Sequence, residues 1–151
     1  MDKIDRRIIA HLQKDGRMPV IDLADRVGLT PTPCARRVAR LEAEGIITGY
    51  SARVDQAKLG YPLTVFIFVE LERQSHETLS GFERAVTRFD EVVECHLMTG
   101  TRDILLKVVT PDLTAFDRFL ETQLVHIPGI RATRSSFSLR TMVQRDVLPL
   151  D

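Results

Sequence analysis

The spacing of hydrophobic residues changes near residue 60 of this chain. Before that point they recur as on one face of a helix, and after it short strand-like runs alternate with helical stretches. A chain of 151 residues has room for one ordinary domain, or for a small module followed by a compact second domain. The change of period favours the second organisation: a first domain at residues 1–50, a linker strand at 51–62 and a second domain at 63–151.

Residues 1–50 carry three short helical patterns. The first runs from Ile4 to about Leu12, the second follows Pro19 and ends at Gly28, and the third follows Thr30, which we expect to cap it. Prolines in the first turn of the third helix are tolerated there because their missing N–H groups have no helical partner. The run at 46–54 predicts a short strand after this helix.

The third helix is predicted to have a basic face and an apolar face. At about 100° per residue its three arginines fall on the side of Thr32, and no acid lies between Thr30 and Leu41. The apolar side is predicted to hold Cys34, Ala35, Val38 and Leu41. A helix, a glycine-containing turn and a second helix of this polarity is typical of modules that place the second helix in the major groove of DNA. A plain three-helix bundle with solvated arginines is the alternative.

The predicted partner of this first domain is double-stranded DNA. The candidate DNA-binding residues are Thr30, Thr32, Pro33, Arg36, Arg37 and Arg40. An arginine can bond the edge of a guanine in a bidentate fashion or bridge phosphates, and a threonine offers a small hydroxyl contact. We expect Thr32 and either Arg36 or Arg37 to lie nearest the bases, and Arg40 and Thr30 to lie nearer phosphate.

The second domain follows a βαββαβ pattern. Strand-like runs at 63–71, 92–98, 104–109 and 130–143 alternate with helical patterns around 79–89 and 113–127, and the two middle strands are joined by a hairpin at 99–102. This order is the ferredoxin-like plan, in which two helices cover one face of a four-stranded antiparallel sheet. The predicted fold class is therefore α+β, with an N-terminal helix-turn-helix and a C-terminal ferredoxin-like domain.

The predicted sheet is apolar on both faces. In the first strand Val65 and Ile67 alternate with Phe66 and Phe68, and the third strand has a similar two-sided pattern around Leu105. An uncovered sheet face of this kind would expose more apolar surface than soluble monomers usually do. We therefore expect a homodimer in which a second subunit covers the open face by two-fold packing.

Several segments together resemble the leucine-responsive (Lrp/AsnC) regulators over nearly the whole chain. The segments are Leu23-Ala24-Asp25-Arg26-Val27-Gly28-Leu29, Leu41-Glu42-Ala43-Glu44-Gly45-Ile46-Ile47, Glu94-Cys95-His96-Leu97 and Leu105-Leu106-Lys107-Val108. The resemblance implies a winged-type helix-turn-helix, a ferredoxin-like domain that binds amino acids, and dimers that assemble further to tetramers or octamers. It also implies that Cys34 is a packing residue.

In members of this family the effector amino acid lies against the hairpin loop, at an interface between dimers. The effector-binding residues implied by position are Leu97, Gly100, Thr101, Arg102, Asp103, Ser136 and Ser138. A glycine allows close approach of the backbone to a ligand, and the carboxylate of Asp103 would receive an ammonium group or organise the loop. Here Thr101, Arg102 and Ile104 replace an acid and two aromatics of the commoner family loop. Three alternatives stay open: an acidic or keto-acid ligand, an ordinary amino acid, or no effector.

Other classes of protein are less well supported by the sequence. It shows no Ser-His-Asp order, phosphate-cradling loop or metal-ligand spacing, so we expect no enzyme, metal or cofactor, with a ferredoxin-like enzyme as the remote alternative. A net charge of zero disfavours an architectural DNA-compacting protein as the sole role, although that alternative also stays open. No apolar run approaches the roughly 20 residues of a membrane span, and the N-terminus does not resemble a secretory signal. We expect a cytoplasmic protein without a membrane partner.

Overall fold

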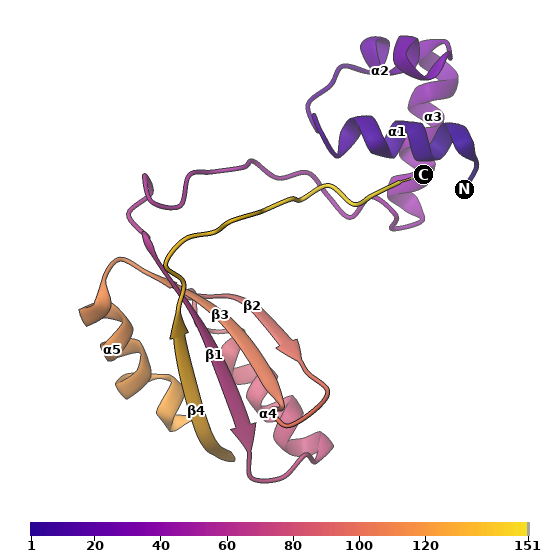
Figure 1. Cartoon of the computed structure of the whole chain (residues 1–151). Coiled ribbons are helices and arrows are strands. Elements are labelled where there is room, and N and C mark those ends of the chain that lie inside the picture. Colours follow the sequence, from indigo (N-terminus) through magenta and orange to yellow (C-terminus); the bar gives the residue numbers. More distant parts are fainter. Residues whose placement is uncertain (151) are drawn as a thin grey trace. The chain divides into compact units, whose positions relative to one another are not determined.

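The structure, a computed structural model, describes residues 1–150. The chain forms two compact units (Figure 1). The first unit contains Met1–Arg53 together with the residues from Met142 onward, and the second contains Val54–Thr141. The C-terminal residues thus group with the first unit, whereas the sequence assigned them to the second domain. Residue 151, the last of that predicted domain, lies outside the described residues. Each helix within residues 1–150 is too short or too polar to cross a membrane.

The first unit is built from the three predicted helices. They are α1 (Lys3–Leu12), α2 (Val20–Val27) and α3 (Pro31–Ala43). Gly28 ends α2 with a φ of 76°, in the left-handed region that glycine adopts without steric cost. A turn of two further residues then leads into α3, where Pro31 occupies the first helical position. The helix-turn-helix expected from the sequence is present.

The three helices enclose a small apolar core. Its fully buried members are Ile8, Leu23, Ala24, Val27, Cys34 and Leu41. The interpretation of Cys34 as a packing residue is confirmed, and burial raises the pKa of its thiol. Ala35, which the sequence placed on the apolar side of α3, is exposed instead. The apolar stripe of α3 is therefore narrower than predicted.

The predictions of a strand at 46–54 and of a linker strand at 51–62 are wrong. The described residues between Ala43 and Leu63 form turns and irregular backbone only. The N–H groups of Ile46 and Ile47 donate to the carbonyl oxygen of Leu41, at 2.9 and 3.1 Å, and so help to end α3. Ile47 also packs against the core of the first unit. This pair therefore completes the helical unit and does not start a strand.

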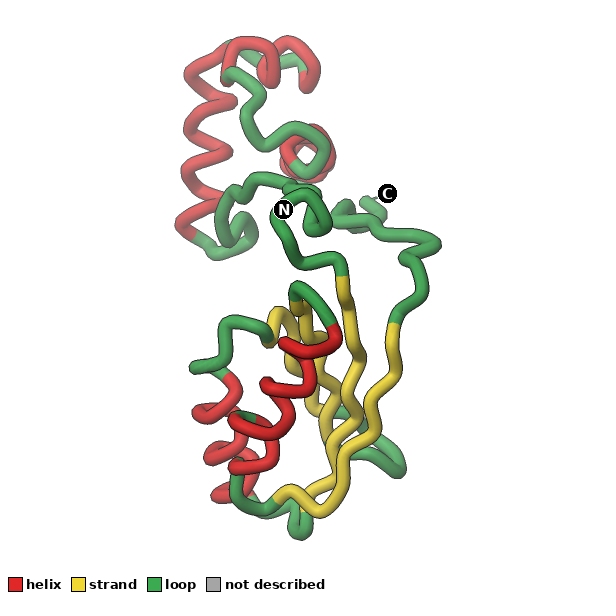
Figure 2. The backbone as a smooth tube through the Cα atoms, turned by 90° about the vertical axis from the view of Figure 1, so that its left-hand side faces the viewer, coloured by secondary structure: helices red, strands yellow, loops and turns green. Residues whose placement is uncertain are grey.

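The second unit has the βαββαβ order of a ferredoxin-like fold. Its elements are β1 (Leu63–Leu71), α4 (His76–Val86), β2 (Val92–Leu97), β3 (Ile104–Thr110), α5 (Leu113–Thr122), the short 3₁₀ helix η1 (Leu124–His126) and β4 (Ile130–Phe137). The strands pair antiparallel in the order β2-β3-β1-β4. In Figure 2 the two helices lie on one side of the strands. The predicted fold class is confirmed, although the last strand ends at Phe137 rather than near residue 143.

The two faces of this sheet have different surroundings. On the helix-covered face Val65, Ile67 and Val69 of β1 are fully buried and belong to the main core. On the other face Phe66 and Phe68 are only half-buried. The strand register places Phe68 between Leu105 and Arg134, and Phe66 between Lys107 and Ser136. The apolar open face expected from the sequence is therefore present, with charged residues beside its aromatic rings.

The C-terminal segment returns to the first unit as an irregular tail. The side chain of Gln13, at the end of α1, donates to the carbonyl oxygen of Leu148 at 3.3 Å and accepts from its N–H group at 2.7 Å. Arg53 forms an ion pair with Asp146 at 3.3 Å. These contacts attach the tail to the end of α1 and to the segment that leaves the helix-turn-helix.

Candidate nucleic-acid interface

The beginning of α3 is shaped by its two prolines. The backbone of Thr30 is in the N-cap position, but its hydroxyl makes no capping hydrogen bond, in contrast to our expectation. Pro31 and Pro33 lack N–H groups, so Thr32 alone supplies a backbone donor in the first three helical positions. This helix end is therefore poorly suited to cradle a phosphate through its backbone, which leaves side chains as the groups there that could contact DNA.

The exposed face of α3 combines small side chains with one arginine. Thr32, Ala35, Arg36 and Ala39 are all exposed. Within residues 1–150 the guanidinium group of Arg36 has no hydrogen-bond or ion-pair partner. Small side chains allow a helix to approach base edges, and a free guanidinium can bond a guanine or a phosphate. The exposure of Thr32 and Arg36 is compatible with their predicted role, whereas Pro33, also predicted to contact DNA, is partly buried.

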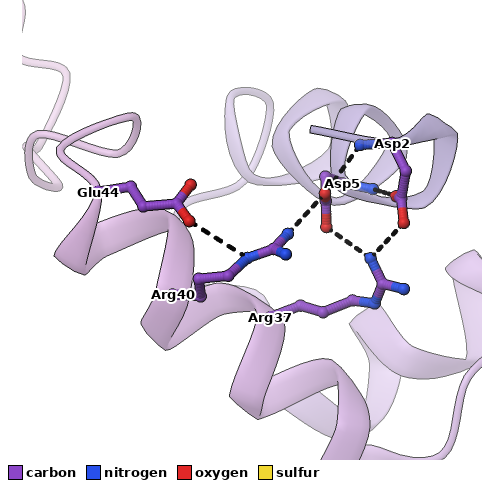
Figure 3. Close-up of polar contacts among 5 residues, drawn as sticks. All are labelled: Asp2, Asp5, Arg37, Arg40 and Glu44. Atoms are coloured by element: carbon purple, nitrogen blue, oxygen red, sulfur yellow. Dashed lines mark hydrogen bonds and ion pairs between the residues drawn. The ribbon is translucent and has the colours of Figure 1, made fainter.

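The other two arginines of α3 bind carboxylates of the N-terminal segment (Figure 3). The Nη1 atom of Arg37 lies 2.7 Å from an oxygen of Asp2 and 2.8 Å from an oxygen of Asp5. The Nη2 atom of Arg40 lies 2.6 Å from the other oxygen of Asp5, and its Nε atom lies 3.7 Å from Glu44. We call Asp2, Asp5, Arg37 and Arg40 the α1–α3 clasp. The sequence grouped Arg36, Arg37 and Arg40 together, and the structure separates them.

Asp5 is the buried centre of the clasp. Its side chain is 1% exposed, and it exchanges hydrogen bonds with Asp2, each backbone N–H donating to the other's carboxylate at 2.9 Å. Burial alone would raise the pKa of Asp5, but the hydrogen bonds from Asp2, Arg37 and Arg40 lower it to about 2. Asp5 therefore stays ionised at neutral pH.

Asp2 and Asp5 were not among the functional residues expected from the sequence. One signal was present, because Asp5 lies three residues before Ile8 and seven before Leu12, on the apolar face of α1. An acid at such a position needs a cationic or hydrogen-bonding partner. A second signal was the Asp2-x-x-Asp5 spacing, which is that of a reciprocal helix cap.

In the second unit, Asp103 organises the hairpin loop. It is buried, and its carboxylate accepts hydrogen bonds from the N–H group of Leu71 at 2.6 Å and from the side-chain amide of Gln74. Both carboxylate oxygens thus have partners within the chain. Of the two roles considered for Asp103, the structure supports organisation of the loop rather than a free anion waiting for an ammonium group.

The other predicted effector residues lie in separate places. Gly100 adopts a φ of 109° in the exposed hairpin beside Thr101, while the guanidinium of Arg102 stacks over the ring of Phe68, 4.3 Å from its centroid. Ser138 lies toward the other end of β1, where it donates its N–H to Thr64, while Ser136 pairs with Phe66 in the middle of the strand. Thr64 and Val69, the β1 residue bonded to the hairpin, are about 16 Å apart along the strand. A single chain therefore does not bring this set of residues together.

An apolar hollow of about 390 Å³ opens between α4 and the edge strand β2. Its walls are mainly hydrophobic and include Leu79, Phe82, Val86, Cys95, Leu97 and Ile104. Leu97 is the predicted effector residue that contributes to these walls, and its side chain is exposed. The alternation of β2 in the sequence did not reveal this hollow, because α4 supplies half of its lining.

Potential metal ligands and cysteine thiols do not form a cluster in the described part of the chain. Within residues 1–150, no three side chains of His, Cys, Asp or Glu are grouped closely enough to hold a metal ion. Cys34 is buried and Cys95 is exposed, and neither forms a disulfide. Although Cys95 is exposed as a residue, partial desolvation of its sulfur and the nearby carboxylate of Glu83 raise the pKa of its thiol, which disfavours the reactive thiolate.

Comparison with known families accounts for both units. Residues 1–48 match the winged helix-turn-helix DNA-binding model, and residues 64–148 match the model of the Lrp/AsnC ligand binding domain. The chain belongs to the Lrp/AsnC family of transcriptional regulators. The helix-turn-helix and the ferredoxin-like fold described above are the two parts of a regulator of this family, and the resemblance noted in the sequence is confirmed.

Relatives of this Lrp/AsnC regulator match it over nearly their full length. The Bkd operon transcriptional regulator of Pseudomonas aeruginosa is 42% identical over 150 residues, which cover 99% of this chain and 98% of the relative. The leucine-responsive regulatory protein of Escherichia coli is 40% identical over 148 residues, covering 98% and 90%.

Solved structures of the Lrp/AsnC family agree with this fold. A transcriptional regulator of Neisseria meningitidis in complex with L-Met has a TM-score of 0.94 at 34% identity, covering 100% of this chain and 97% of that one. An AsnC family regulator from Agrobacterium tumefaciens has a TM-score of 0.93 at 39% identity, covering 99% and 97%. Similarity extends over both units in each case.

Proposed function

We propose that this Lrp/AsnC regulator reads double-stranded DNA through the exposed face of α3, with Arg36 as its principal base-contacting or phosphate-contacting arginine. The observation that supports this assignment is the free guanidinium of Arg36 beside Thr32, Ala35 and Ala39. Arg37 and Arg40 are held by carboxylates and have fewer N–H groups left for DNA. Thr30 and Pro33 serve at the edge of this surface.

A footprint on the DNA upstream of the protein's own gene tests the proposed surface. We expect Arg36→Ala to weaken binding to the protected site by roughly 1 to 3 kcal/mol, because a direct contact is lost. Arg118→Ala is the control, since this exposed arginine lies on α5 in the second unit. Equal binding of the Arg36 variant and the unmodified protein would contradict the assignment. Equal affinity of the unmodified protein for random DNA would favour the architectural role.

We also propose that the functional unit is a dimer formed by two-fold packing of the open sheet faces. Phe66 and Phe68 are half-buried in the single chain, and a second subunit would remove them from water. Such a dimer would present two copies of α3 to a pseudo-palindromic operator whose half-sites are about one helical turn, or a multiple of it, apart. By the family resemblance, we expect dimers to assemble into tetramers or octamers.

For the second unit, we propose binding of an amino acid or a related acid as effector. The match to a ligand-binding domain supports this role, and the neisserial neighbour is itself a complex with L-Met. The carboxylate of Asp103 already accepts hydrogen bonds from Leu71 and Gln74, which favours a role in ordering the loop over a role as a dedicated ammonium anchor. Calorimetric titration with amino acids and with their keto acids distinguishes the two ligand classes. Absence of heat from both would contradict effector binding.

The regulated genes are proposed to serve amino-acid metabolism. The support is that the relative from Escherichia coli is a leucine-responsive regulatory protein. A DNA-binding regulator works in the compartment that contains its DNA, which we expect to be the cytoplasm.

A further inference from the structure

The α1–α3 clasp neutralises two of the three arginines on the proposed recognition helix. One guanidinium nitrogen of Arg37 is shared by two carboxylates, and Arg40 bonds the second oxygen of Asp5. Two acids and two arginines leave the clasp with no net charge. The positive charge that the sequence assigns to α3 is therefore concentrated on Arg36.

We propose that the clasp limits non-specific DNA binding by withholding Arg37 and Arg40 from the phosphate backbone. Carboxylates and phosphates are competing anions for a guanidinium group, and both bond it through charge-assisted hydrogen bonds. Each phosphate neutralised by a protein cation adds to affinity for any DNA sequence. With Arg37 and Arg40 occupied, binding depends more strongly on contacts that recognise particular bases. This inference rests on DNA binding by α3.

The two acids of the clasp differ in their exposure to solvent, and therefore in how safely each can be substituted. The side chain of Asp5 is 1% exposed and Asp2 is 53% exposed, so Asp2 is the carboxylate that approaching phosphates can displace. Asp2 also caps α1 through a hydrogen bond from the N–H group of Asp5. Asparagine caps helices about as well as aspartate, so Asp2→Asn removes the charge and keeps the cap.

The test is the salt dependence of binding to a labelled DNA duplex of random sequence, using the full chain. We expect Asp2→Asn to raise affinity several-fold at low salt and to steepen the plot of log affinity against log salt by up to about one per DNA-bound subunit, because Arg37 then keeps Asp5 as its one carboxylate partner in the clasp and phosphate competes for it more readily. Asp5→Asn, which removes the carboxylate that Arg37 and Arg40 share, is expected to steepen the plot further. Asp22→Asn is the matched control, since it removes one charge from the first turn of α2 and touches no arginine of α3.

A double variant separates this role from a merely structural one. If release of Arg37 from Asp2 causes the gain, Asp2→Asn combined with Arg37→Ala returns the salt dependence to that of Arg37→Ala alone. An unchanged slope in Asp2→Asn, a gain equal to that of Asp22→Asn, or a gain that persists without Arg37 would overturn the proposal. Far-ultraviolet circular dichroism verifies folding, and Asp2→Asn keeps the test valid even if Asp5→Asn does not fold. If the unmodified protein did not bind DNA at all, this result would instead contradict the proposed function.

Discussion

Asp5 carries a negative charge where solvent hardly reaches it. A buried carboxylate is costly unless cations and hydrogen-bond donors surround it, and Asp5 has two guanidinium groups and one backbone N–H. These partners hold α3 against the start of α1. Because its pKa falls from the ordinary value of 3.8 to about 2, the ionised form stabilises the folded chain.

This shift predicts a pH-dependent stability difference. Near neutral pH we expect Asp5→Asn to lower the free energy of unfolding of the first unit by roughly 2 kcal/mol, because two arginines lose an ionised acceptor. The folded pKa lies below the unfolded one, so the stabilisation is present above pH 3.8 and is lost as the pH falls toward about 2. Urea unfolding of both proteins across this range measures the difference. A gap that stays constant down to pH 2 would contradict it.

At this scale the sequence predicted some side chains well and others poorly. The burial of Cys34 and the exposure of Arg36 follow from the helical period, which depends on one helix alone. The carboxylate partners of Arg37 and Arg40 could not be predicted in this way, because a helical projection contains no information about which residues of α1 will face α3. The clasp is a property of two helices that meet.

The turn between α2 and α3 depends on the left-handed backbone of Gly28. A Cβ atom at this position would meet nothing within 4 Å, so replacement acts through the backbone alone. We expect Gly28→Ala to lower stability by about 1 kcal/mol, since the φ of 76° is unfavourable for alanine. Gly81→Ala, also free of contacts but inside α4, is expected to raise stability by up to about 1 kcal/mol. Chemical unfolding curves measure both, and equal signs would contradict the explanation.

The helices and strands themselves were largely predictable, because their apolar periods match the faces they bury. The irregular structure of residues 46–54 was not predictable in this way. A strand needs a neighbouring strand, and the N–H groups of Ile46 and Ile47 already bond the carbonyl oxygen of Leu41. The end of β4 was misplaced for a related reason. Phe137 pairs with Val65 near the beginning of β1, so little partner strand remains for the residues that follow.

For the whole molecule, the open sheet face predicts the state of association. We expect Phe66→Asp to shift the protein from dimers toward monomers, because a carboxylate would be buried between two apolar faces. Leu59→Asp is the control, since Leu59 is 61% exposed in the segment before β1. Sedimentation velocity at several concentrations measures the change. Identical sedimentation of the two variants would contradict sheet-to-sheet pairing.

The effector site shows a limit of prediction at this scale. Family resemblance supplied positions in the hairpin and at Ser136 and Ser138, yet these lie at separate places on one chain. Neither the hydrophobic periodicity nor the family resemblance indicates which of the predicted effector-binding residues come from the same subunit. The engaged carboxylate of Asp103 likewise depends on Gln74, which is remote in sequence.

The polar contacts of the C-terminal tail with the rest of the first unit include the two hydrogen bonds of Gln13 and the ion pair of Arg53. Each such contact is worth about 1 kcal/mol or less. The tail is nevertheless covalently joined to the same chain through residues 138–141, which keeps its effective concentration near α1 in about the millimolar range. A weak contact can thus remain formed while staying easy to open, and a separate peptide of the same sequence would displace it only at comparable concentrations.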